Sequence, residues 1–180
     1  MAADERPGPA GGDVIVVMGV SGCGKTTVAE ALAARLGGSY LEADRLHLPA
    51  SVARMAAGIP LTDEDRWPWL EAVAAAAAEA RPRPVVVACS ALRRAYRDLL
   101  RARLGPVRFV HLAGSRETIA ARLAGRSAHF FDPALLDSQF ATLEPPGTDE
   151  DAVTLDVTLP PARLVDEALA ALASPAPAGP

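Results

Sequence analysis

The chain has 180 residues, of which 50% are hydrophobic and only 4% aromatic, and its formal net charge is −4 at pH 7. This length fits a single domain, and an acidic chain is a poor candidate for binding nucleic acid or an anionic membrane surface. No apolar run approaches the roughly 18 residues of a membrane span, and residues 1–12 lack the apolar core of a signal peptide, so we expect a cytoplasmic protein. Two cysteines, Cys23 and Cys89, are too few for a disulfide framework. The expected partner is a small molecule.

The basic residues are almost all arginine. Arginine supplies 17 of the 18, and the only lysine is Lys25. Because the two residue types serve almost equally well on a solvated surface, a chain so poor in lysine has kept one where the exchange is costly. Lys25 is therefore a candidate functional residue.

The predicted elements alternate between strand and helix. Residues 14–18 (VIVVM) form a short buried strand that ends at Gly19, and from Thr26 onward apolar residues recur on one helical face. Further strands are predicted over 39–43, 85–90, 107–112 and 151–158, and helices over 49–57, 62–80, 91–103, 115–126 and around 164–172. Continuous apolar strands indicate an α/β fold, in which a parallel five-stranded sheet is covered by helices on both faces.

One domain is expected to include all of these elements. It spans residues 13–173, and residues 1–12 and 174–180 are predicted to be disordered tails. The stretch from about 125 to 146 is irregular and carries the turn Pro145-Pro146-Gly147. We interpret this stretch as a mobile lid over a site.

Residues 19–26 read GVSGCGKT and match the phosphate-binding loop GxxxxGK[ST], directly after a predicted strand and before a predicted helix. The glycines would allow backbone N–H groups to turn inward around a phosphate chain, and the helix start adds its positive dipole end. Lys25 would contact the outer phosphates, and the Thr26 hydroxyl would bind Mg²⁺. We therefore expect ATP and Mg²⁺ as cofactors, with a nucleotide site formed by Gly19, Val20, Ser21, Gly22, Cys23, Gly24, Lys25, Thr26 and Thr27.

Two absences favour a small-molecule kinase. Without a second lysine the chain cannot contain the [NT]KxD segment with which GTPases recognise guanine, and the apolar strand over 85–90 ends in Cys89 and Ser90 rather than in a carboxylate. Such a kinase needs a carboxylate at the carboxyl end of a neighbouring strand, and Asp44 is so placed. The competing interpretation of Asp44 is an N-cap for the helix over 49–57.

Six blocks of sequence follow one another in the order found in one family of enzymes: GVSGCGKT (19–26), ADRLH (43–47), RMAAGIPLTDEDRWPWL (54–70), CSALRRAYRDLLR (89–101), RLAGRSAHFF (122–131) and QFATLEPP (139–146). On these blocks the chain resembles the gluconate kinases of the small P-loop type. The resemblance implies transfer of the ATP γ-phosphate to the terminal hydroxyl of D-gluconate, which gives 6-phosphogluconate. It also implies a homodimeric cytoplasmic enzyme with an adenylate-kinase-like fold.

The resemblance also implies roles for individual residues. Lys25, Asp44 and Arg126 are expected in catalysis, and Arg122 against the adenine ring. The sugar acid is expected to contact Asp44, His47, Arg54, Arg66, Ser90, Arg93, His129 and Gln139. Among these, Arg54, Arg66 and Arg93 are candidates for the carboxylate, since a guanidinium fork fits it bidentately.

Three departures from the family pattern leave the identity of the sugar acid open. His47-Leu48 stands where the family has His-Pro, Ser51 where it has Asn, and Arg54 and Arg93 where it has Lys. Two other hypotheses stay open: a P-loop kinase of another small acceptor, such as another sugar acid or a nucleoside monophosphate, and a nucleotide-binding regulatory module without phosphoryl transfer. ATP turnover that depends on an added acceptor would separate the enzyme from the module. Two further residues are expected to be structural: His111 in the core and Trp69 as a packing anchor. For Arg122 and Arg126 the alternative to a functional role is a helix face that pairs with Glu117.

Overall fold

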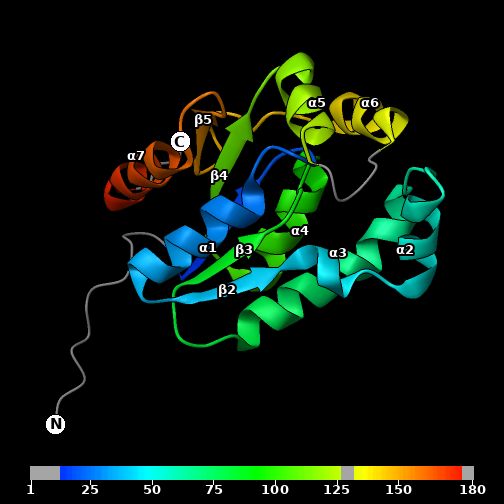
Figure 1. The fold of residues 1–180 in the computed structure, drawn as a ribbon. Coiled ribbons are helices and arrows are strands. Elements are labelled where there is room, and N and C mark those ends of the chain that lie inside the picture. Colours follow the sequence, from blue (N-terminus) through cyan, green and yellow to red (C-terminus); the bar gives the residue numbers. More distant parts are fainter. Residues whose placement is uncertain (1–12, 127–131, 176–180) are drawn as a thin grey trace, which may run out of the picture.

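The computed structural model describes residues 13–126 and 132–175. Its helices flank a central parallel sheet (Figure 1). The strands are β1 (Val14–Met18), β2 (Ser39–Glu42), β3 (Val85–Ala88), β4 (Val107–Ala113) and β5 (Ala152–Asp156). The helices are α1 (Lys25–Leu36), α2 (Pro49–Ala56), α3 (Asp63–Glu79), α4 (Arg94–Leu104), α5 (Arg116–Ala124), α6 (Pro133–Thr142) and α7 (Pro161–Ala173), and a short 3₁₀ turn spans Ala43–Leu46. Most of the two predicted tails, and His129, lie outside the described residues.

The five strands lie in the order β2-β3-β1-β4-β5, and every pair of neighbours is parallel. The central strand β1 pairs with β3 on one side, where Val16 faces Val87, and with β4 on the other, where Val16 faces Phe109. All five residues of β1 are buried, as expected for a strand covered on both faces. The predicted α/β class with a five-stranded parallel sheet is confirmed.

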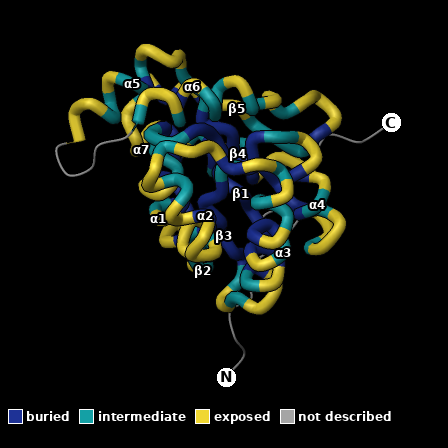
Figure 2. The backbone as a smooth tube through the Cα atoms, turned by 90° about the vertical axis from the view of Figure 1, so that its right-hand side faces the viewer, coloured by how far each residue is buried: buried dark blue, intermediate teal, exposed yellow. Residues whose placement is uncertain are grey.

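Alternate residues of β1 point into two separate hydrophobic cores. Ile15 and Val17 pack with α1 and α7 on one face, and Val14, Val16 and Met18 pack with α3 and α4 on the other. Figure 2 shows this buried interior as the dark tube through β1, β3 and β4. With few large rings available, small buried residues such as Ala29, Ala33, Ala74 and Ala77 bring the helices close to the sheet.

Several predicted helix boundaries hold, and two predictions need correction. Helix α3 begins with the expected capping box, in which Thr62 and Asp65 exchange side-chain-to-backbone hydrogen bonds. Helix α4 begins only at Arg94, because the chain turns at Ala91 with φ 43° and is extended at Arg93. The predicted lid is not irregular throughout, since it contains helix α6, whose N-cap Asp132 accepts from Ala134 N at 2.8 Å before Pro133 opens the first turn.

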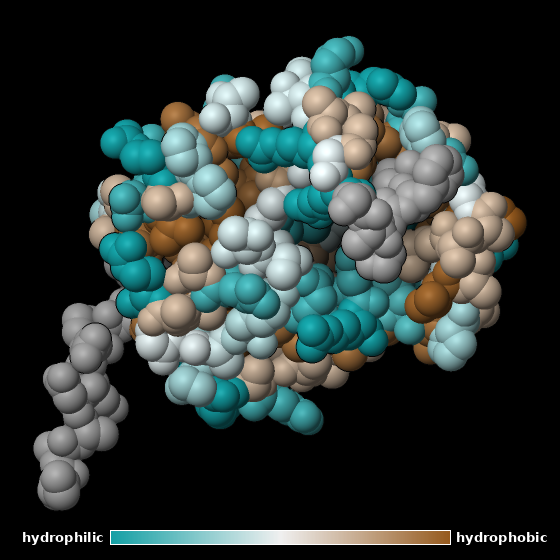
Figure 3. All heavy atoms as spheres, in the orientation of Figure 1, coloured by the Kyte–Doolittle hydropathy of each residue, from teal (hydrophilic) through white to brown (hydrophobic). Residues whose placement is uncertain are grey.

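The face in Figure 3 mixes polar and apolar residues, and apolar and small residues are among those on the side where α2 lies. Leu48, Val52 and Ile59, in and around α2, are exposed large hydrophobic residues. Within the described ranges, no helix has both the length and the apolar character to cross a bilayer.

Candidate active site

The phosphate-binding loop joins β1 to α1 in a conformation that requires glycine. Gly19 has φ 143°, and a Cβ there would lie 2.8 Å from the carbonyl oxygen of Leu112. Gly22 has φ 84°, and a Cβ there would lie 2.7 Å from Leu123 of α5, which packs over the loop. Helix α1 begins at Lys25, directly after this turn. The N–H groups of the loop and of the first helical turn therefore form one anion-binding cradle.

Lys25 lies across this loop. Its Nζ donates to the carbonyl oxygens of Gly19 and Val20, at 3.0 Å each, and the side chain lines the pocket described below. An ammonium group has three donors, so one remains for a phosphate oxygen. The predicted contact of Lys25 with the outer phosphates is compatible with this position and stays a prediction.

Glu42, at the carboxyl end of β2, is a site residue that the sequence interpretation missed. Its Oε2 accepts from the Thr26 hydroxyl at 2.7 Å and from the Tyr40 hydroxyl at 2.6 Å. Burial and the Glu42 carboxylate raise the pKa of Tyr40, so this phenol stays protonated and donates. The signal that could have identified Glu42 is its place near the carboxyl end of the predicted strand over 39–43, the same kind of position that identified Asp44.

Asp44 lies in the 3₁₀ turn that follows β2, and it does not cap α2. The N-cap residue of α2 is Leu48, where no side chain caps the helix, so the competing interpretation of Asp44 is wrong. His47 Nε2 lies 3.7 Å from Asp44 Oδ1. Desolvation within the site would raise the pKa of Asp44, but the His47 hydrogen bond and the positive charge of Lys25 outweigh it and hold this pKa below its ordinary value.

His47 is fixed by Trp69 of α3. The two rings are stacked, with centroids 4.2 Å apart and planes 13° from parallel, and Trp69 Nε1 donates to the carbonyl oxygen of Ala43 at 2.7 Å. Trp69 is buried, as expected of a packing anchor, but it also lines the pocket. The Nδ1 atom of His47 is buried without a hydrogen-bond partner in the described part of the chain, so it is available to a ligand hydroxyl.

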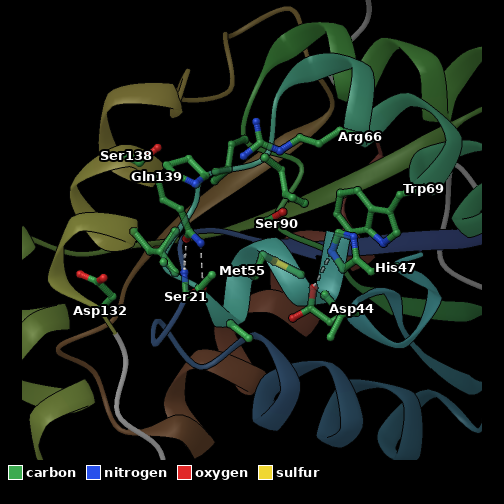
Figure 4. A pocket seen from close by; sticks show the side chains of 18 of the residues that line it. Ser21, Asp44, His47, Met55, Arg66, Trp69, Ser90, Asp132, Ser138 and Gln139 are labelled. Carbon is green, nitrogen blue, oxygen red and sulfur yellow. Dashed lines mark hydrogen bonds and ion pairs between the residues drawn. The ribbon is translucent and has the colours of Figure 1, made fainter. Parts of the chain in front are cut away.

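These side chains surround a cavity of about 570 Å³ at the carboxyl ends of β1, β2 and β3 (Figure 4). Seven of the predicted site residues line it: Ser21, Lys25, Asp44, His47, Arg66, Ser90 and Gln139. Its apolar wall was not predicted; α2 contributes Val52 and Met55 to this wall, and α6 contributes Leu135. A cavity of this size, with a few convergent polar groups on apolar walls, suits a small organic ligand.

Gln139 of α6 lines the pocket and also reaches the phosphate-binding loop. Its Oε1 accepts from Ser21 N at 2.7 Å, and its Nε2 donates to Ser21 Oγ at 2.9 Å. Both bonds appear at the left of Figure 4. At the same wall, a Cβ on Gly58 would lie 2.5 Å from Asp132 Oδ2, so the turn after α2 touches the start of α6.

Two predicted carboxylate ligands do not line the pocket. Arg54 Nε lies 3.6 Å from Asp65 Oδ2, and Arg93 Nη1 donates to Asp63 Oδ2 at 3.1 Å. Each of these guanidinium groups is thus engaged with a carboxylate at the start of α3. Only Arg66, of the three predicted arginines, reaches the pocket.

The predicted nucleotide and lid arginines lie on and just after α5. Arg122 Nη2 donates to the carbonyl oxygen of Val157, just beyond β5, rather than pairing with Glu117. Arg126 is exposed at the end of the helix and does not line the pocket, and His129 is outside the described residues.

His111 and Cys89 are core residues. Burial and the Arg97 charge lower the pKa of His111 to about 4, and only its Nδ1 has a partner, Thr154 Oγ1 at 3.4 Å. Burial raises the pKa of the Cys89 thiol to about 12, which leaves it unreactive. Neither side chain adds chemistry to the site.

The fold has a parallel sheet with a phosphate-binding loop after β1, and the Asp44 carboxylate lines the same pocket as that loop. Together these features define a P-loop kinase of a small molecule. The AAA domain family matches residues 14–146. The gluconokinase of Gluconobacter oxydans is 46% identical over 85% of this chain and 87% of its own length. The thermoresistant gluconokinase of Escherichia coli is 43% identical over 82% and 86%.

A solved structure agrees with these sequence relatives. The crystal structure of a gluconokinase from Sinorhizobium meliloti superimposes with a TM-score of 0.84 at 48% identity and covers 93% of this chain and 94% of that one. The chain belongs to the gluconokinase family.

Proposed function

We propose that this protein transfers the γ-phosphoryl group of ATP to the terminal hydroxyl of D-gluconate, giving ADP and 6-phospho-D-gluconate. One observation carries the proposal beyond family membership: Lys25 of the phosphate-binding loop, Asp44 and Arg66 line the same cavity. In that one cavity, Lys25 can bind phosphate, Asp44 can accept a proton from the substrate hydroxyl, and Arg66 can bind the substrate carboxylate.

The phosphates of ATP occupy the cradle formed by residues 19–27, with Lys25 on the outer phosphates. Arg122, beside the turn after β5, is proposed to contact the adenine. The described residues contain no cluster of three or more metal-ligating side chains, which suits Mg²⁺, a cation that takes one or two protein ligands together with phosphate oxygens and water. Thr26 and Glu42, whose oxygens are 2.7 Å apart, are the residues that would hold it, and the ion would neutralise phosphate charge.

The acceptor hydroxyl lies against Asp44 in this proposal. Its oxygen attacks the γ-phosphorus while the bond from that phosphorus to the β,γ-bridging oxygen breaks, and the hydroxyl proton passes to Asp44. Since the transition state is loose, Asp44 mainly orients the hydroxyl and accepts its proton late. Lys25 stabilises the charge on the transferring group, and Arg126 is proposed to join it.

The other predicted acceptor contacts have unequal support. His47, Ser90 and Gln139 line the cavity, and the unpartnered Nδ1 of His47 supports a contact with a hydroxyl. Arg54, Arg93 and His129 rest on the family resemblance alone. The homodimer likewise rests on the family resemblance, whereas a single domain over 13–173 and a cytoplasmic location are proposed from the length and composition of the chain as well.

Acceptor-dependent release of ADP tests the proposal. Purified protein is given ATP, Mg²⁺ and one member of a panel of sugar acids, sugars and nucleoside monophosphates, and the product is identified by ³¹P NMR. We expect turnover with D-gluconate that far exceeds turnover without an acceptor, and a phosphate monoester at its terminal carbon. Turnover with another acceptor but not with gluconate would contradict the proposed substrate, and no acceptor-dependent turnover would contradict the proposed reaction.

A further inference from the structure

Arg66 is held in the pocket wall by a buried tyrosine. Its Nη1 donates to the Tyr96 hydroxyl oxygen at 3.0 Å, and its guanidinium carbon lies 5.6 Å from the centroid of the Tyr96 ring. The Tyr96 hydroxyl in turn donates to Asp63 Oδ1. Tyr96 belongs to α4 whereas Asp63 and Arg66 belong to α3, so this chain of hydrogen bonds spans two packed helices.

The partner of Arg66 is unusual among the arginines near the pocket. Arg93 is 3.1 Å from an Asp63 oxygen and Arg54 is 3.6 Å from an Asp65 oxygen, but no carboxylate of the described residues lies within 4.0 Å of the Arg66 guanidinium. A phenol oxygen is a neutral acceptor, so it fixes the direction of Arg66 without neutralising its charge. The charge stays available to a ligand.

The protonation state of Tyr96 favours a hydrogen bond in which Arg66 donates and the Tyr96 oxygen accepts. The residue is only 1% exposed, and burial together with Asp63 raises its pKa. The phenol therefore stays protonated, and its single proton is committed to Asp63. Its lone pairs are left to accept from Arg66.

The position of Arg66 in the pocket indicates which ligand group it meets. The other permanent cation in the wall is Lys25, which the phosphate loop engages, and the carboxylate of Asp44 would repel a second carboxylate. In Figure 4, Arg66 enters above Ser90, away from Asp44 and His47. An acid whose terminal hydroxyl lies at Asp44 therefore turns its carboxylate toward Arg66.

We propose that Tyr96, oriented by Asp63, is a positioning residue that presents an unneutralised Arg66 to the carboxylate of the acceptor, so that the pocket selects acids over neutral polyols of the same length. This inference rests on the proposed function and adds the group that determines specificity for its substrate class. Tyr96 itself does not line the pocket and acts through Arg66.

The test compares Tyr96→Phe with wild type, using D-gluconate and its neutral analogue D-glucitol. Without the phenol, Arg66 is free to turn toward Asp63. We expect the KM for gluconate to rise about tenfold, the size of one hydrogen bond to a charged group, whereas the KM for ATP stays the same and kcat falls much less. The preference for gluconate over glucitol falls by the same factor. An unchanged KM for gluconate, or equal losses with both acceptors, would overturn the proposal.

Two further variants keep the test decisive. Arg66→Lys retains the charge but loses the fork, and should show the same loss of preference even if Tyr96→Phe folds poorly. Arg103→Lys is the matched control, because Arg103 also lies on α4 but pairs with Glu71 on the surface at 2.7 Å. It should leave all three constants unchanged, and a loss of preference in this control would overturn the assignment to Arg66.

Calorimetric titration of gluconate separates the inference from the proposed function, since it measures binding without turnover. Wild-type protein that uses gluconate, together with a Tyr96→Phe variant that binds it equally well, overturns only the inference. Wild-type protein that neither binds nor phosphorylates gluconate overturns both.

Discussion

At the scale of single residues, the proposed reaction depends most on Lys25 and Asp44. Both act through a polar atom at the pocket wall, and neither supplies a core contact: the ammonium of Lys25 bonds loop carbonyls, and Asp44 faces His47. Substitutions at these positions are therefore expected to change rate far more than folding.

Replacing Lys25 by Arg is expected to lower kcat/KM at least a hundredfold even though the charge is kept. A compact ammonium fits between the Gly19 and Val20 carbonyls and a phosphate, whereas a planar fork does not. Lys25→Ala should abolish turnover. Steady-state kinetics provide the measurement, and circular dichroism melting checks the fold. Activity close to wild type in the Arg variant would contradict the role given to this lysine.

Asp44→Asn keeps the shape of the side chain and removes the proton acceptor, so kcat should fall by roughly two to four orders of magnitude while ATP affinity changes little. The pKa of Asp44 lies below its ordinary value, so the carboxylate is ionised throughout the neutral range, and the acid limb it gives to kcat/KM lies below the ordinary range of an aspartate.

A titration with Mg²⁺ distinguishes the roles of Asp44. If Asp44 mainly held the metal shell, nucleotide affinity would fall with kcat, and added Mg²⁺ would restore part of the rate. A normal kcat at every Mg²⁺ concentration would show that the base must be sought elsewhere.

At the scale of elements, the site is built by contacts between segments far apart in the chain. Helix α6 bonds to the phosphate-binding loop across 118 positions through Gln139 and Ser21. The turn after α2 touches the start of α6 at Gly58 and Asp132, so α2 and α6 close one wall of the pocket. The hydrogen bonds of Gln139 couple this helix to the loop, so the helix is suited to respond to what the loop binds.

Gln139→Ala should therefore release α6 from the loop. The loss of two hydrogen bonds, at about 1 kcal/mol each, predicts a kcat lower by up to about thirtyfold and faster hydrogen–deuterium exchange over residues 133–142. Thr142→Ala is the control on the same helix, because its hydroxyl bonds only the Ser138 carbonyl oxygen, at 2.8 Å. If exchange in α6 were equal in the Gln139 variant and the control, Gln139 would not hold this helix.

At the scale of the whole molecule, the two cores on either side of the sheet bury polar groups that must stay satisfied as the pH changes. Arg97 and Glu150, fully buried, form a pair at 2.7 Å that joins α4 to the segment before β5, and Arg101 adds a second contact to Glu150. These contacts lower the pKa of Glu150 to about 2 despite its burial. Its stabilising effect is lost only as pH falls from about 4.5 toward 2.

His111 makes the stability of the fold sensitive to acid at a higher pH than Glu150 does. Its pKa falls from 6.5 to about 4 on folding, so it stabilises the fold above pH 6.5 and this contribution disappears as pH falls from 6.5 to 4. Between pH 7 and pH 5 the loss is about 2 kcal/mol of unfolding free energy. Urea unfolding at the two pH values should show a drop that is smaller in His111→Gln. An equal drop in both proteins would exclude His111 as its source.

The sequence by itself determined what depends on local pattern. The buried strand before Gly19, the loop from Gly19 to Thr26 and the capping box at Thr62 are each specified by neighbouring residues, and all three lie where the sequence predicts. The parallel sheet follows from the alternation of apolar strands with helices. The P-loop kinase class, the position of Lys25 at the start of the helix after the loop, and the position of Asp44 just after a strand follow from the sequence alone.

Only the tertiary structure decided which polar side chains share the pocket. Arg54, Arg66 and Arg93 are equivalent in the sequence, but the packing of α3 against α4 directs Arg93 to Asp63 and Arg66 to Tyr96. Glu42 with Thr26, Gln139 with Ser21 and His47 with Trp69 were likewise not predicted as pairs. The physical reason is that a residue's partners across a fold depend on how helices pack on the sheet, and the periodicity of one segment reports only which of its faces is buried.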